Sequence, residues 1–429
     1  MKQVSDAKPS SSAQNSTAVP TPRAFAFPRQ IDSPLGQSLR WQLEQYAKSR
    51  LDLPEDIIRQ FGIAMNRGDR LGDAYINAAF ATREGKARAR KDVEQALKGG
   101  IESVDDPSPE LLALFGQINT DPEWVDWTAV EHGAEVFRRY GSELYPYFGM
   151  ISFAGYATRS IKTPLALTGA YTGNSAFHRF LETCRLWTDT TEPSAMRPGG
   201  VGRRSAVMVR VLHSIIRHTL LPHAEWDREE LGVPISQLGL FQTLILTTQW
   251  PGQQLKLLGY RPSDQDVVAM MHHWRYVGHL MGAEPPWYPE TAADGFRAQL
   301  LASLAEEPVF GPDTENLCTS FMNTYLPPED ARGLRRVVGN LRYQAQLGHA
   351  MFYLGPDLHK ASGLPDPGLF RYAPLARFLP NFARETARRN IPGVAGWIDQ
   401  VHRMARQEFL RKNLEGGEAK FAPVDKLAR

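Results

Sequence analysis

The apolar residues of this 429-residue chain recur at helical spacing almost throughout, and this periodicity limits its fold more than any other feature. Two clear examples are Leu39, Leu43, Tyr46 and Ala47, and later Leu334, Val337, Val338 and Leu341. Runs of alternating β-branched residues between turn signals, which would predict strands, are not found. The sequence therefore predicts an all-α protein.

Three segments carry signals for where helices begin and end. Ser263 with Asp266 is typical of a capping box and predicts a helix over 263–281. Two prolines followed by two acids predict the start of a helix over 327–347. The polar, proline- and glycine-rich residues 188–204 predict a loop.

The composition is that of a globular protein, with 42% hydrophobic and 22% charged residues. A net charge of +2 gives no reason to expect nucleic acid as a partner. Two cysteines cannot form a disulfide scaffold or a four-thiolate zinc site. No uncharged apolar run reaches the roughly 18 residues of a transmembrane helix.

The ends of the chain differ from its centre. The N-terminus is rich in serine and proline and has no apolar signal-peptide core, so we expect a cytoplasmic protein unless a signal has been removed or replaced. We predict a disordered segment over 1–35, a single all-α domain over 36–412 and a flexible tail over 413–429.

Residues 205–218 form an apolar helix with one polar face. Arg210, His213 and Arg217 lie on that face at intervals of three and four residues. Buried arginines stay charged and need anionic partners. One interpretation is a haem site, in which His213 binds the iron and the arginines bind the propionates. The other is a structural network of arginines and acids around a core histidine.

Residues 142–164 contain a second polar group. Arg159, Lys162 and Thr163 share a helical face, Pro164 is expected to end the helix, and Glu143 lies upstream of a break expected near Pro146. These groups beside an apolar surface are consistent with a reaction chamber, and equally with a solvated helix end.

Three histidines lie together on the predicted 263–281 helix. His272, His273 and His279 have no carboxylate three or four residues away, which argues against a carboxylate-bridged metal pair. We therefore interpret them as packing histidines.

Taken together, these segments resemble the family of haem-dependent oxygenases that includes the latex clearing proteins (rubber oxygenases) and the MpaB oxygenase. The resemblance covers roughly residues 120–350 and is carried by three motifs: Arg210-Val211-Leu212-His213 followed by Arg217, Leu231-Gly232-Val233-Pro234-Ile235-Ser236-Gln237, and Trp274-Arg275-Tyr276-Val277-Gly278 with Gly282. Arg159-x-x-Lys162-Thr163, with Glu143 sixteen residues before Arg159, is most similar to the latex clearing proteins.

The resemblance implies a globin-like helical core with additional helices at both ends. It implies that His213 is the proximal ligand of a b-type haem, that Arg159, Lys162 and Thr163 lie on the distal side, and that Glu143 is the base. Lys162 is a possible distal iron ligand. The implied reaction uses dioxygen to cleave C=C bonds of cis-1,4-polyisoprene or a similar apolar chain, giving aldehyde and ketone products. We expect a monomer.

Three other functions remain open from the residues. The first is an intracellular haem oxygenase or peroxidase that acts on a small terpenoid or lipid. The second is a haem-binding protein without turnover, and the third is a helical scaffold without a cofactor. The Soret band of the purified protein separates the last from the others.

Overall fold

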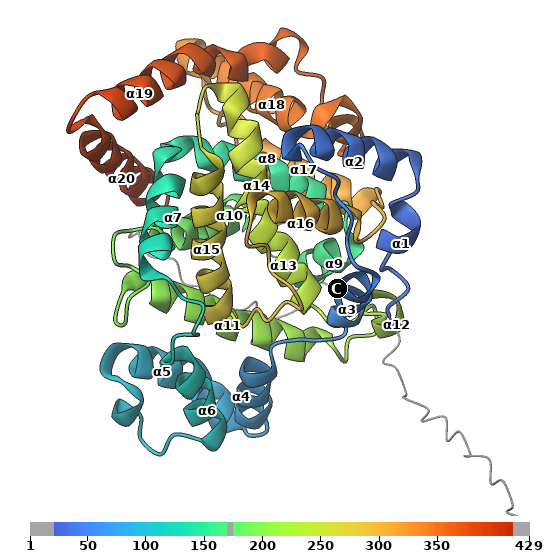
Figure 1. Cartoon of the computed structure of the whole chain (residues 1–429), viewed down its shortest axis with the longest axis vertical. Helices are drawn as coiled ribbons and strands as arrows, with labels where there is room; N and C mark the ends of the chain where they lie inside the picture. The colour runs from blue at the N-terminus through green and yellow to red at the C-terminus, as the bar shows by residue number, and fades with distance from the viewer. Residues whose placement is uncertain (1–20, 170–174, 415–429) are drawn as a thin grey trace, which may run out of the picture.

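The computed structural model describes residues 21–169 and 175–414, and these ranges fold into α-helices and short 3-10 helices without a strand (Figure 1). One isolated bridge between Phe25 and Glu306 is the sole β-type pairing in the described ranges. The predicted all-α class is confirmed.

The helices follow one another with short connections. The first part of the chain contains α1 (Phe27–Gln30), α2 (Pro34–Ala47), α3 (Glu55–Ala64), α4 (Arg70–Phe80), α5 (Arg83–Gly99), η1 (Ile101–Ser103) and α6 (Pro109–Ile118). The central part contains α7 (Trp127–Arg139), η2 (Gly141–Glu143), α8 (Leu144–Gly155), α9 (Arg159–Thr168), α10 (Ser175–Thr190), α11 (Val201–Leu220), α12 (Arg228–Leu231), α13 (Gln237–Leu246), α14 (Gln249–Gln254), η3 (Leu255–Leu258) and α15 (Asp264–Leu280). The last part contains α16 (Ala292–Leu304), α17 (Pro312–Asn323), α18 (Gly333–Ala361), η4 (Gly368–Arg377), α19 (Phe378–Asn390) and α20 (Val394–Asn413).

The central helices form the core, and two smaller groups flank it. In Figure 1, α4, α5 and α6 lie at one end, whereas α18, α19 and η4 lie at the opposite end. Helix α11 separates the central helices from the first group and packs against α4, α10 and α15. This position makes α11 buried along most of its length, as its apolar sequence predicts.

The helix boundaries agree with the sequence in one case and differ in two. Ser263 and Asp266 form the predicted capping box at the start of α15. Helices α10 and α11 extend further than expected and shorten the predicted 188–204 loop to residues 191–200. Helix α18 begins at Gly333 because Pro328 and Ala331 form a turn instead of a first helical turn.

The predicted disorder up to residue 35 is wrong from residue 21 onward. Ala26 and Phe27 are buried, and the backbone N–H of Ala26 donates to Ala305 O at 2.7 Å. The aromatic residues of this segment supply the apolar surface that its serine-rich neighbours lack. Residues 1–20 lie outside the described residues, as does the predicted tail from 415 onward; before it, α20 continues to Asn413.

Within the described ranges, no helix has both the length and the apolar character needed to cross a bilayer.

A histidine-lined apolar cavity as the candidate site

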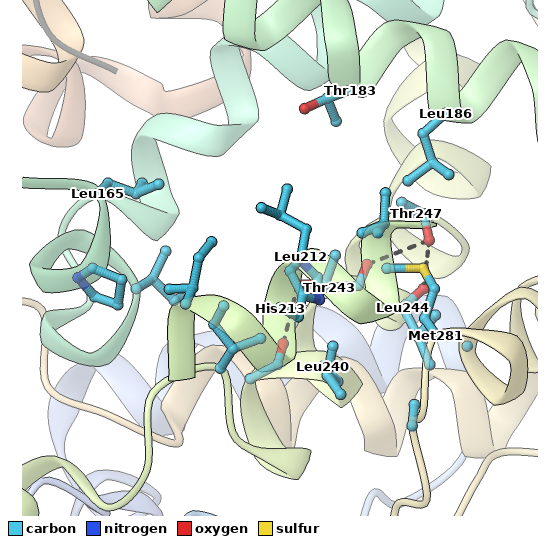
Figure 2. A pocket seen from close by; sticks show the side chains of 18 of the residues that line it. Leu165, Thr183, Leu186, Leu212, His213, Leu240, Thr243, Leu244, Thr247 and Met281 are labelled. Carbon is cyan, nitrogen blue, oxygen red and sulfur yellow. Dashed lines mark hydrogen bonds between the residues drawn. The ribbon is translucent and has the colours of Figure 1, made fainter. Parts of the chain in front are cut away.

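A cavity of about 380 Å³ lies between α9 and α10 on one side and α11 and α13 on the other. In Figure 2, Thr183 and Leu186 lie across open space from His213 and Leu240. The side chains that line the cavity are mostly hydrocarbon. The lining includes Ser160, Ile161, Pro164, Leu165, Thr168, Arg179, Glu182, Thr183, Leu186, Trp187, Leu212, His213, Gly239, Leu240, Thr243, Thr247 and Trp274.

Four threonines line the cavity without making it strongly polar. The hydroxyls of Thr168 and Thr183 donate to carbonyls four residues earlier, at 2.8 Å and 3.3 Å. Thr243 and Thr247 do the same within α13, at 3.0 Å and 3.3 Å. A hydroxyl that donates to its own helix has no proton left for a ligand. The lining therefore suits a largely apolar ligand.

His213 places an imidazole at this cavity. Its ring lies deep in the protein, with part of its surface facing the cavity, and no described residue bonds to its buried Nδ1. Burial, and secondarily the charge of Arg217, lowers the pKa of His213 to about 4, although Asp69 opposes this shift. The imidazole is therefore neutral at physiological pH, which is the form that binds metal ions. Trp274 also lines the cavity, and its indole Nε1 is buried without a partner among the described residues.

Arg210 and Arg217 do not face the cavity, and the structure contains the ion-pair network that was the alternative interpretation. Arg210 binds Asp69 through two hydrogen bonds of 2.6 Å and 2.8 Å. Arg217 binds Asp73 at 2.8 Å and also donates to the carbonyl of Ile235. Both acids belong to the start of α4, so these pairs anchor α4 to α11. Neither arginine is among the described lining residues, and their assignment to haem propionates stays a prediction.

Glu143 and Arg159 are also held outside the cavity lining. Glu143 is buried at the end of η2 and accepts a hydrogen bond from Arg377 of η4. The Arg159 guanidinium donates to Glu230 at 2.7 Å and remains partly exposed. The expected break near Pro146 corresponds to the boundary between η2 and α8: η2 ends at Glu143, and Pro146 lies in the first turn of α8, which ends at Gly155.

Lys162 and Thr163 lie on the face of α9 that points away from the cavity. The Lys162 ammonium donates to the Val309 carbonyl and to Thr314 Oγ1, and burial lowers the pKa of Lys162. Pro164 does not end α9, which continues to Thr168. The cavity-facing residues of α9 are instead Ser160, Ile161, Pro164, Leu165 and Thr168. The four predicted catalytic residues are therefore not among the described residues that line the cavity with His213.

The three histidines of α15 are packing residues, as predicted. His272 Nε2 accepts the backbone N–H of Asp126 at 3.0 Å, and His273 Nδ1 lies 3.1 Å from Val130 O. The His279 ring stacks against Tyr276. No group of three or more His, Cys, Asp or Glu residues in the described ranges could hold a metal ion.

A polar group on α10, which no sequence motif singled out, also lines the cavity. Arg179 and Glu182 form an ion pair of 2.7 Å beside the cavity, and Thr183 lies next to them. Arg179 is the one permanently charged cation among the described lining residues. The signal was present, because residues 179, 182, 183, 186 and 187 recur at helical spacing.

Together, the fold and the site define an all-helical protein with a neutral histidine at an apolar internal cavity. The model of a family described as "ER-bound oxygenase mpaB/B'/Rubber oxygenase, catalytic domain" matches residues 138–384, more than half of the chain. The chain belongs to this family of oxygenases, and the family expected from the sequence motifs is confirmed.

Two relatives illustrate the relationship. A rubber oxygenase from Streptomyces sp. (strain K30) is 26% identical over 215 residues, which is 48% of this chain and 50% of the relative. The chain thus matches about half the length of this curated relative. A solved structure of latex clearing protein LCP in the closed state shares the fold, with a TM-score of 0.60 and 21% identity over 80% of this chain and 91% of that one.

Proposed function

We propose that this protein is a b-type haem-dependent oxygenase that cleaves C=C bonds of an isoprenoid or similar apolar chain with dioxygen. The observation that carries this proposal is His213, a neutral imidazole that lines a mainly hydrocarbon cavity and whose buried Nδ1 has no partner among the described residues. The family supplies the class of reaction.

The residues present fit the proximal side of a haem. A histidine imidazole is the ligand that many haem proteins provide, and a flat apolar macrocycle matches a lining of hydrocarbon side chains. When bound, the haem supplies the redox chemistry and the site for dioxygen. The protein supplies the neutral imidazole of His213 and a lining in which the threonine hydroxyls are already satisfied. Arg210 and Arg217, the predicted partners of the propionates, are bound to Asp69 and Asp73 in this structure.

The proposed reaction balances without a further reductant. Both atoms of one dioxygen molecule enter the substrate, the C=C bond breaks, and two C=O groups form as an aldehyde and a ketone. The apolar lining contributes by holding the alkene and excluding water. Arg179 and Glu182 form a charged pair among the described lining residues, and we propose that this pair orients the reacting part of the substrate.

The test has a binding stage and a turnover stage. Protein expressed with ample haem should show a Soret band, and acid–acetone should extract the chromophore. Oxygen consumption is then measured with polyisoprene latex and with a short soluble terpenoid. Consumption with latex and carbonyl-ended products supports the full proposal. Turnover of the terpenoid alone limits the substrate to small isoprenoids, and colourless protein contradicts a haem enzyme.

A further inference from the structure

The first ten residues of α18 are exposed except for Gly339, which lies against Pro327. Within residues 333–342, the apolar side chains Leu334, Val337 and Leu341 are 77%, 54% and 50% exposed. With Val338 they recur at intervals of three and four residues and so form one apolar stripe. A helix of this pattern normally buries the stripe, but no described element covers it.

More apolar side chains are exposed at the same end of the molecule. Leu369 of η4 and Leu379 of α19 are 85% and 73% exposed; η4 packs against both α18 and α19, and these elements lie in the part opposite α4–α6 (Figure 1). Scattered apolar residues are ordinary on a protein surface, whereas repeated ones on neighbouring elements mark a binding surface. We call the exposed residues of 332–342, η4 and α19 the C-terminal surface.

The charge of the C-terminal surface identifies what it fits. Residues 332–389 contain ten Lys or Arg against three Asp or Glu, although the whole chain is nearly neutral. Arg332, Arg335, Arg336 and Arg342 are exposed, and no carboxylate of the described residues forms an ion pair with any of them. A second copy of this chain would place arginines against arginines, which is unfavourable. The partner should therefore be both anionic and apolar.

We propose that the C-terminal surface binds an anionic phospholipid bilayer, with residues 333–342 lying in the plane of the interface. A helix with an apolar stripe and flanking arginines inserts the stripe at the boundary between headgroups and acyl chains. The arginines meanwhile approach the negative lipid headgroups. A surface that faces only water has no need of exposed apolar side chains beside cations without acid partners. An anionic bilayer binds both. The proposal does not depend on haem or on the reaction.

Vesicle co-sedimentation tests the proposal with the full-length protein. Wild type should sediment with phosphatidylcholine vesicles that contain phosphatidylserine, more weakly at high salt, and far less with pure phosphatidylcholine. The double variants L334Q/L341Q and R335E/R336E should each lower the partition coefficient by roughly tenfold or more.

Matched controls are available away from the C-terminal surface. Leu112 is 47% exposed on α6, and Arg59 and Arg83 are exposed arginines on α3 and α5. L112Q and R59E/R83E should bind vesicles like wild type. Circular dichroism should show unchanged folding in every variant.

Three results would overturn the proposal. The first is wild-type protein that stays in the supernatant with anionic vesicles. The second is binding that both surface variants retain. The third is a dimer, measured by light scattering, that L334Q/L341Q dissociates without vesicle binding in any form, because the surface would then join two copies of this chain.

Discussion

Helices α11 and α15 each contain a histidine with a buried, unbonded ring nitrogen, and of the two the histidine of α11 lines the described cavity. Nδ1 of His213 and Nε2 of His273 both lack a partner among the described residues, and burial lowers the pKa of these histidines to about 4 and about 3. His273 is fully enclosed beside Trp274, whereas His213 faces the space between α9, α10 and α13. A neutral imidazole indicates a ligand site where there is also room for a ligand.

The largest expected effect is a loss of haem when the histidine of α11 is replaced, but not when the histidine of α15 is replaced. His213→Ala should abolish or sharply lower haem content, because it removes the imidazole beside the cavity. His273→Ala should retain the Soret band even though it leaves a hole in the core. The ratio of haem absorbance to protein absorbance measures the difference.

His272→Ala and His279→Ala are the controls for this pair, and both should keep their haem. Circular dichroism should show that His213→Ala remains helical. If His273→Ala loses haem and His213→Ala does not, the ligand lies on α15 and the comparison fails.

The next effect should come from filling the cavity without touching a histidine. A Cβ added to Gly239 would meet only Ser236 Oγ, at 3.7 Å, so this cavity-lining position has space for a larger side chain. Gly239→Leu should reduce haem content or substrate turnover several-fold, because the new side chain occupies ligand volume. Absorbance and oxygen consumption measure the two outcomes.

Gly116 offers a matched control on α6, exposed and with nothing within 4 Å of an added Cβ. Gly116→Leu should match wild type in both measurements. If Gly239→Leu also has wild-type haem content and turnover, the space beside His213 is not the ligand site.

Part of this contrast could be predicted from the sequence. Local signals correctly gave the all-α class, the buried helix around His213 and the capping box of α15. The acids that bind Arg210 and Arg217 could not be predicted, because they lie 141 and 144 residues away in the sequence. Sequence spacing shows that an arginine needs an acid, but it does not show which acid the tertiary fold supplies.

The orientation of amphipathic helices was harder to predict. Lys162 and Thr163 share a polar face, but the opposite face of α9 meets the cavity. The stripe that begins at Leu334 has the periodicity of a core helix and is nevertheless exposed. Periodicity identifies residues on one face, whereas the neighbours of that face depend on long-range packing.

A smaller effect should appear in the pH dependence of folding of the cofactor-free protein. The pKa of His273 falls from 6.5 to about 3 on folding because burial penalises the charged ring, so the unfolded chain holds a proton that the folded one lacks. Stability should therefore fall as pH drops below about 6.5, with a contribution on the order of 2 kcal/mol between pH 7 and pH 5.

His273→Leu removes this titration while keeping an apolar side chain of similar size. Chemical denaturation of both proteins at the two pH values gives the difference in slope, in which the other groups cancel. A variant with the wild-type slope would mean that His273 is not buried as a neutral ring.

The smallest expected effect concerns Glu143, which tests whether bordering the cavity is what matters. Glu143 is buried and binds Arg377, and it does not line the cavity. Glu143→Gln should therefore keep wild-type haem content and an oxygenase rate within a few-fold of wild type. Loss of the charged pair should lower the free energy of unfolding by about 1 kcal/mol, as measured by denaturation. Thr163→Ala, also outside the lining, should change the rate and the stability less still.

A rate loss of two to four powers of ten in Glu143→Gln would show that Glu143 acts as the general base. The helices would then have to rearrange to bring it to the substrate, and the cavity beside His213 would be only part of the active site.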